Sequence, residues 1–109
     1  MKKLTEDELN LLFAICKAMG HKNRMDILNF LATQTECYFG DIHEELPIAK
    51  ATVSQHLKEL KNAGLIQGTI FLPKVKYCIN RENWRKAQQL FNDFFNSLTE
   101  ENCKTTCCN

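Results

Sequence analysis

Three cysteine side chains near the C-terminus offer the most distinctive chemistry in this sequence. Cys103, Cys107 and Cys108 lie in a short polar segment that gives no packing reason for three thiols. Thiolates are preferred ligands of soft ions, and the short loop between Cys103 and Cys107 costs little entropy to close around one ion. Three sulfurs fit a pyramidal arsenic(III) or antimony(III) centre, whereas a structural zinc site normally takes four ligands. The sequence therefore predicts a soft metal or metalloid site here, with an incidental cysteine-bearing tail as the alternative.

The other three cysteines occur singly, as do the three histidines. Structural disulfides are uncommon in a reducing compartment, so we expect Cys16 and Cys78 to be small buried apolar residues. For Cys37 two roles are left open, a redox-active thiol and an auxiliary metal ligand. We expect His21 and His43 to be surface or capping groups.

A second kind of chemistry follows from a polar helix face in the middle of the chain. Val53, Leu57 and Leu60 recur at helical spacing, which predicts a helix from Ala51 to Ala63 that ends at Gly64. Short hydroxyl, amide and cationic side chains on a helix suit contacts with base edges and phosphates. Here the polar side chains on the helix are Lys50, Thr52, Ser54, Gln55, His56 and Lys58. For His56 a structural hydrogen bond is the alternative to a DNA contact.

The segments on either side of this helix predict a winged helix-turn-helix. Residues 40–46 form a short helical segment that Pro47 ends, and in such a motif the first helix braces the second in the major groove. Residues 67–72 and 75–79 are β-branched and aromatic-rich and predict a hairpin around residues 72–74. Lys74 and Lys76 at its tip are placed to reach the sugar-phosphate backbone. The alternatives are a helical pair with a solvated polar face and a hairpin that only shields the core.

The net charge of the chain gives little support for a nucleic-acid partner, but the distribution of the charged residues along the sequence does support one. The chain has 109 residues, is 44% hydrophobic and carries a formal net charge of only +1. Residues 50–76 nevertheless hold five lysines and one glutamate, which places the basic charge on the predicted helix and hairpin. The length suits one compact domain. No apolar run resembles a signal segment or a membrane span, so we expect a cytoplasmic protein with no membrane partner.

Helices at both ends of the chain supply the core and surplus apolar surface. Thr5 to Glu8 forms a capping box, and residues 22–32 form a second helix. The last helix begins near Asn80. Together the first and last helices offer more apolar area than one small core needs, which predicts a homodimer. The apolar stripe of the first helix consists of Leu9, Leu12, Phe13 and Cys16. The wide apolar face of the last helix, of which the domain core can bury part, consists of Trp84, Ala87, Leu90, Phe91, Phe94, Phe95 and Leu98.

These features together resemble the ArsR/SmtB family of metal-sensing repressors. The resemblance covers about residues 9–98, and its most specific parts are residues 21–28 and the segment Thr52 to Ile66. It implies a mainly α fold with a small β-hairpin, a winged helix-turn-helix that dimerises through its first and last helices. It also implies repression of an operator until an inducer binds. The resemblance places Ser54, Gln55 and His56 at the DNA face.

Two inducer sites of that family do not carry over. The arsenite pattern Cys-x-Cys-Asp on the third helix is broken, because Gly40 precedes Asp41. The zinc site on the last helix needs histidine ligands, and residues 83–98 contain none. The tail cysteines are therefore the remaining candidate for the inducer site.

We accordingly expect residues 1–98 to form a DNA-binding and dimerisation domain and residues 99–109 to form a cysteine-bearing tail. The predicted function is a repressor that leaves its operator when arsenite, antimonite or another soft metal ion binds Cys103, Cys107 and Cys108. A thiol redox repressor of the same fold is the alternative, and a metal-storage protein that does not bind DNA is a third possibility. The sequence shows no acid-base pair at a recognisable spacing, no phosphate loop and no Cys-x-x-Cys motif, which argues against an enzyme.

Overall fold

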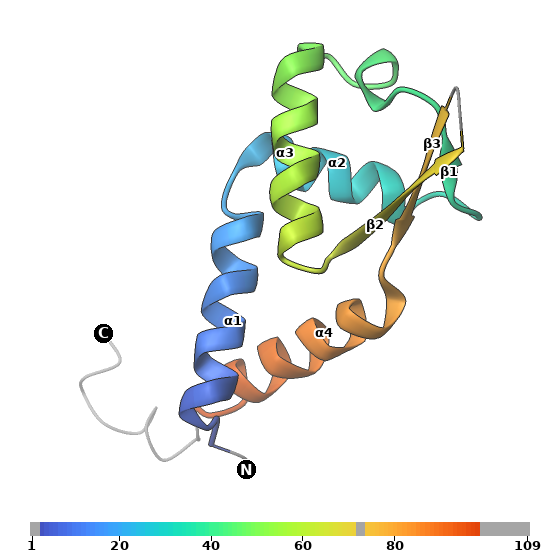
Figure 1. The fold of residues 1–109 in the computed structure, drawn as a ribbon. Coiled ribbons are helices and arrows are strands. Elements are labelled where there is room, and N and C mark those ends of the chain that lie inside the picture. The colour runs from blue at the N-terminus through green and yellow to red at the C-terminus, as the bar shows by residue number, and fades with distance from the viewer. Residues whose placement is uncertain (1–2, 72–73, 99–109) are drawn as a thin grey trace.

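The computed structural model describes residues 3–71 and 74–98, so the predicted metal ligands Cys103, Cys107 and Cys108 lie outside the described residues. The described chain is mainly helical with one small sheet (Figure 1). In order, its elements are α1 (Glu6–Met19), α2 (Lys22–Ala32), β1 (Tyr38–Phe39), η1 (Ile42–Glu44), α3 (Lys50–Asn62), β2 (Ile66–Phe71), β3 (Lys74–Ile79) and α4 (Arg81–Phe95).

Side-chain caps explain where three of the helices begin. Thr5 forms the predicted capping box with Glu8 at the start of α1. His21 caps α2 by accepting a hydrogen bond at Nδ1 from the backbone N–H of Asn23, so the expectation that His21 caps a helix is confirmed. Asn80 caps α4 in the same way. Each cap satisfies a backbone donor that the first helical turn leaves unpaired.

The sheet is antiparallel, with strand order β1-β3-β2. The hairpin of β2 and β3 is the predicted wing, which confirms the winged helix-turn-helix fold. The two-residue strand β1 was not predicted and pairs Tyr38 with Tyr77. The helix expected over residues 40–46 is wrong in extent, since only one 3₁₀ turn forms at Ile42–Glu44. Pro47 disfavours helical backbone at the residue before it, which leaves too few residues for an α-helix.

The core lies where α1, α2, α3 and the start of the hairpin meet. Its most deeply buried side chains are Ile27 of α2, Leu60 of α3 and Leu65 at the start of the hairpin, each at most 1% exposed. Ile42 of η1 is 2% exposed, so the single 3₁₀ turn is also fixed to this core. Burial of these side chains holds α3 firmly against the rest of the domain.

The buried face of α1 differs from the predicted one. Leu12, Ile15 and Ala18 are buried, whereas Phe13 is 68% exposed and Cys16 is also exposed. The prediction that Cys16 is a buried apolar residue is therefore wrong. Helical spacing allows two overlapping apolar stripes on α1, and packing against α2 and α4 selects the one that contains Ile15.

A glycine turn connects α3 to the hairpin and is tied to α4. Gly64 has φ +80°, the left-handed conformation that glycine adopts without a Cβ penalty. The amide of Asn83 on α4 donates a hydrogen bond to the Gly64 carbonyl at 2.9 Å. A Cβ at position 64 would lie 2.8 Å from that amide nitrogen, so the turn has no room for a larger residue. The direction of the hairpin relative to α3 is set at this point.

Cys37 and Cys78 form a disulfide, contrary to the expectation that the chain has none and that Cys78 is a buried apolar residue. The pairing of Tyr38 with Tyr77 places Cys37 opposite Cys78 at the next position. Their Cα atoms are 4.6 Å apart, within the range that a disulfide spans. The sequence could not show this pairing because β1 is too short to be recognised.

None of the helices in residues 3–71 and 74–98 has the length and apolar character needed to cross a membrane.

Candidate nucleic-acid interface

One face of α3 is buried and the opposite face is open. Val53, Leu57 and Leu60 pack inward. Away from them, four of the predicted DNA-binding side chains are exposed and Thr52 is half-buried. The exposed four are Lys50, Ser54, Gln55 and Lys58. An exposed helix face of this composition can enter a major groove and donate hydrogen bonds to base edges and phosphates.

A groove of about 340 Å³ lies between α3 and the hairpin. Ser54, Lys58, Lys61 and Asn62 line its helix side, and Gly68 lies on its strand side. Lys61 is exposed and was missing from the predicted contacts, although it follows Lys58 by one helical turn. Residues three apart on a helix lie on the same face, so the position of Lys58 could have identified Lys61 as a further contact. Two ammonium groups along this groove favour a phosphate backbone.

The hairpin carries two further lysines that were predicted to reach the backbone. Lys74 is exposed at the start of β3, and Lys76 is half-buried. The ammonium of Lys76 lies over the ring of Phe39, 5.8 Å from its centroid. In Figure 1 the start of α3 and the far end of the hairpin lie toward the same end of the molecule. Cationic side chains of both elements can therefore face one partner.

His56 is not on the exposed face, which corrects its placement among the DNA-contacting side chains. It is only 6% exposed. Its Nδ1 accepts a hydrogen bond from Arg24 Nε at 3.1 Å, and the same guanidinium donates to the Ala18 carbonyl at 3.1 Å. Its ring lies 4.4 Å from that of His21. His56 follows Val53 by three residues and precedes Leu60 by four, so it lies next to the apolar stripe of the helix. The hydrogen bond from Arg24 on α2 holds the ring in the domain interior. Its role is to join α1, α2 and α3.

The surroundings of His56 favour its neutral form. Burial lowers the pKa of His56 below its usual 6.5, and the neighbouring His21 and the Arg24 guanidinium lower it further. Because Nδ1 accepts a hydrogen bond, the proton of the neutral ring is on Nε2. That buried atom has no hydrogen-bond partner among the described residues.

Gln55 is exposed but already engaged within its own helix. Its amide Nε2 donates to Glu59 Oε1 at 3.2 Å, one turn further along α3. To read a base edge, Gln55 would exchange this hydrogen bond for one to the DNA. The exchange costs little because both groups are solvent-accessible.

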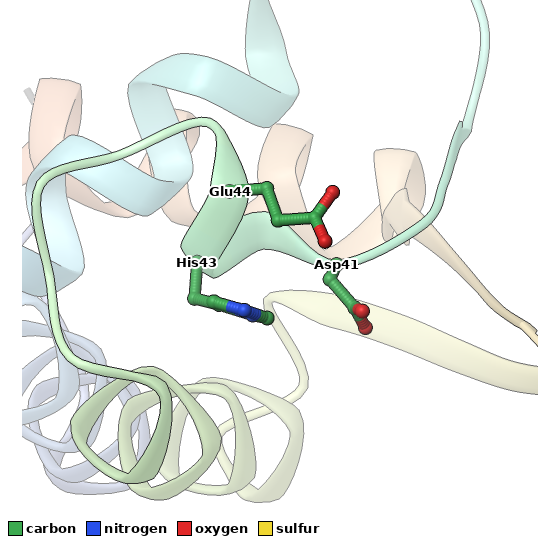
Figure 2. Close-up of side chains that lie close together, drawn as sticks. All are labelled: Asp41, His43 and Glu44. Carbon is green, nitrogen blue, oxygen red and sulfur yellow. The ribbon is translucent and has the colours of Figure 1, made fainter.

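Residues Asp41, His43 and Glu44 form the one group of three possible metal ligands in the described part of the chain (Figure 2). Their ligand atoms lie within 4.8 Å of one another on and just before η1. Two carboxylates and an imidazole suit a borderline or hard cation more than arsenic(III). Asp41 and Glu44 are exposed and His43 is half-buried, and no unpartnered buried atom points to a ligand there. We therefore assign no ion to this group.

Tyrosines on the sheet remain neutral near physiological pH. Burial raises the pKa of Tyr38, and the hydrogen bond from its hydroxyl to Glu45 raises it further. Burial likewise raises the pKa of Tyr77, with a smaller contribution from Asp41. The sheet therefore adds no tyrosinate charge next to the lysines.

The fold and the basic face of α3 define a winged helix-turn-helix DNA-binding protein. Residues 21–67 match the family model described as bacterial regulatory protein, arsR family. The fold is similar to that of the ArsR-like Transcriptional Regulator from Rhodococcus sp. RHA1, with a TM-score of 0.62 and 20% identity over 77% of this chain and 79% of that one. No curated protein matches the sequence. Residues 21–67 therefore match the helix-turn-helix of a family of bacterial regulatory proteins, which supports DNA-binding transcription regulation as the activity of this chain.

We predict that Lys61→Ala weakens binding to all duplex sequences to a similar degree. Affinity falls as the salt concentration rises. Loss of one phosphate contact should make the slope of log affinity against log salt concentration shallower by about 1. Fluorescence anisotropy of a labelled duplex across a salt series measures this slope. Lys17→Ala, which removes an exposed lysine from α1, is the matched control and should leave the slope unchanged. An unchanged slope for Lys61→Ala would remove Lys61 from the interface.

We also predict that His56 makes the domain less stable in mild acid. Well above pH 6.5 the ring is neutral in both the folded and the unfolded state, so it adds no pH dependence there. As the pH falls from 6.5 toward the lower pKa of the folded state, the unfolded state binds a proton that the folded state does not. The free energy of unfolding therefore falls with pH in this window.

Urea denaturation at about pH 7.5 and about pH 5.5 measures the effect, because the two conditions bracket the ordinary histidine pKa. The loss of stability between them should be smaller in His56→Gln than in the wild type. His43→Gln, at a half-buried histidine of η1, should retain the wild-type loss. Equal losses in all three proteins would show that His56 is not the group responsible.

Proposed function

We propose that the protein is a homodimeric repressor that binds operator DNA through α3 and the hairpin. In this proposal a soft metal or metalloid ion bound by Cys103, Cys107 and Cys108 releases the operator. The observation that carries the repressor proposal is the separation of surfaces. Lysine, hydroxyl and amide side chains gather on α3 and its groove, whereas most of the large exposed apolar side chains in the described chain lie on α1 and α4. Ile70 of the hairpin, which lines the groove, is an exception.

The exposed apolar surface supports a second copy of the chain as the partner. Leu9 and Phe13 of α1 are 39% and 68% exposed, and Phe94 and Phe95 of α4 are 45% and 69% exposed. Helices α1 and α4 pack on each other, and Figure 1 shows the start of α1 beside the end of α4. Large apolar side chains gathered at the surface mark interaction sites, and most such assemblies are symmetric dimers. The resemblance to dimeric repressors points to the same two helices.

A dimer would also account for binding with so little net charge. Two copies of α3 related by a twofold axis can read half-sites about 34 Å apart. Each copy then contributes its own lysines, so the affinity depends on two local basic faces and not on the net charge of the chain. The inducer would act by changing how well the two copies of α3 match that spacing.

Thiol chemistry supports the tail as the inducer site. Among the described residues Cys16 is the free cysteine, and Cys37 and Cys78 are bonded to each other. The described chain therefore offers no set of three free thiols, whereas the sequence places three within residues 103–108. Soft trivalent arsenic prefers such a set. Coupling between inducer and operator sites of this kind is typically about 1–3 kcal/mol.

We predict that the protein sediments as a dimer at micromolar concentration. Replacing Phe13 and Phe95 by glutamate places two charges in the proposed interface and should give monomers. Ile70→Glu, at a hairpin residue that is 70% exposed, should leave the dimer intact. Sedimentation equilibrium distinguishes the states, and a monomeric wild type would contradict the proposed assembly.

We predict that arsenite releases the protein from a fluorescent fragment of its own promoter. Anisotropy should fall during titration of the wild type and stay high in a variant with Cys107→Ser and Cys108→Ser. Cys16→Ser is the matched control and should respond like the wild type. Parallel titrations with antimonite, cadmium, zinc and peroxide identify the preferred inducer and separate metal binding from thiol oxidation. An unchanged arsenite response in the tail variant would overturn the tail as the inducer site.

A further inference from the structure

The disulfide between Cys37 and Cys78 closes a covalent ring around the part of the chain that faces DNA. Its two cysteines are 41 positions apart. Between them lie β1, η1, α3, β2 and most of β3, which contain every exposed side chain of the groove and the hairpin lysines. α1, α2 and α4 lie outside this ring. The bond therefore acts on the DNA-facing unit more than on the helices proposed to form the dimer.

β1 is short, so its backbone pairs with the sheet over few residues. β1 pairs with β3 through two residue pairs, Tyr38 with Tyr77 and Phe39 with Lys76. The Gly40 N–H adds a long hydrogen bond of 3.4 Å to the Val75 carbonyl. The disulfide adds a third adjacent residue pair to this ladder, so its loss removes the covalent link between the two strands. Because β1 leads through η1 into α3, the link also limits how α3 moves relative to the wing.

Small molecules can reach the two cysteines. Both are half-buried and line a cavity of about 150 Å³. Beyond the cysteines, Arg81, Trp84 and Arg85 of α4 lie on its wall. Glu36 is the one carboxylate among the residues that line the cavity, so the two guanidinium groups outnumber it. A cavity of this size with two guanidinium groups suits part of an anionic thiol or disulfide.

We propose that Cys37 and Cys78 are a thiol–disulfide switch, exchanging with small carboxylate-bearing thiols and disulfides, that sets the DNA affinity of the recognition unit. The disulfide form binds DNA more tightly because the cross-link has already restricted the motions that binding would otherwise have to restrict. The proposal rests on DNA binding by α3 and the hairpin, and it does not depend on the tail cysteines.

The chemistry balances with one disulfide reagent. A protein thiolate attacks one sulfur of the reagent, whose S–S bond breaks, and one reagent thiolate leaves. The second protein thiolate then attacks the protein sulfur of the mixed disulfide and releases the other reagent thiolate. Two electrons pass from the protein dithiol to the reagent, and the two thiol protons end on the two released thiols. Reduction runs the same steps in reverse.

The test uses the full chain with Cys16, Cys103, Cys107 and Cys108 replaced by serine, so that only the pair remains. The protein is equilibrated in buffers with different ratios of reduced to oxidised glutathione. Alkylation and mass spectrometry give the disulfide fraction, and anisotropy of a promoter duplex gives the affinity. We expect the oxidised form to bind about tenfold more tightly, a typical size for coupling between two sites.

The matched control adds Cys37→Ser and Cys78→Ser, and its affinity should equal that of the reduced form at every ratio. Circular dichroism confirms that the control is folded. If Cys37 and Cys78 form their disulfide and the DNA affinity does not change, the proposed switch is wrong, whereas the proposal that α3 and the hairpin bind DNA still holds. A pair that stays reduced in oxidised glutathione overturns it as well. If neither form binds DNA, DNA binding itself fails and the switch fails with it.

A second measurement tests the cavity. Replacing Arg81 and Arg85 by glutamine should slow oxidation by glutathione disulfide several-fold, the order expected for loss of two nearby charges. Oxidation by the uncharged disulfide of 2-mercaptoethanol should keep its rate. Lys86→Gln, which removes an exposed cation of α4 that does not line the cavity, is the control and should leave both rates unchanged. Equal slowing by both reagents would remove the proposed role of the two arginines.

Discussion

Burial of one face of α3 is the constraint on which the proposed DNA interface depends. Leu60 is completely buried, and Val53 and Leu57 are nearly so. With that stripe fixed, the helix cannot rotate about its axis without exposing apolar area, so Ser54, Gln55 and Lys58 remain on the outside. The left-handed turn at Gly64 then sends the chain into the hairpin and forms one side of the groove. The Arg24–His56 hydrogen bond adds a polar tie between α2 and the same helix.

The same packing leaves two surfaces with different properties. The outward side of α3 and its groove carry hydroxyl, amide and ammonium groups that suit a phosphate backbone. α1 and α4 expose Phe13 and Phe95, which water solvates poorly. Placing the charged surface and the apolar surface on different elements allows DNA binding and self-association at the same time. Regulation then needs only a ligand that favours one arrangement of the two recognition helices.

Five of the six cysteines fall into two groups with different relations to the DNA-facing unit. Cys37 and Cys78 are joined across the sheet at the edge of that unit. Cys103, Cys107 and Cys108 follow α4 in the sequence and lie outside the described residues. The first pair suits two-electron exchange with another thiol, and the second set suits a soft trivalent ion. If both proposals hold, one regulator would respond to cellular thiols and to a metalloid through separate groups.

The sequence by itself determined the elements that have strong local signals. The capping box at Thr5, the helix over residues 22–32, the end of α3 at Gly64 and the hairpin after it all follow from spacing and turn chemistry, which act over a few residues. The polar face of α3 was identified in the same way with Lys50 and Lys58, although Lys61 was missed and His56 is buried. These signals were sufficient for the winged helix-turn-helix and for DNA binding.

Only the tertiary structure decided the features that depend on residues far apart in the chain. The choice of Ile15 over Phe13 as a core residue of α1 depends on α2 and α4, because the helical pattern fits both faces. Burial of His56 depends on Arg24, which lies 32 residues earlier. The disulfide depends on the register between the two-residue strand β1 and β3, which has no periodic signal in the sequence. Local physics fixes the elements, and long-range packing fixes which of their faces and side chains meet.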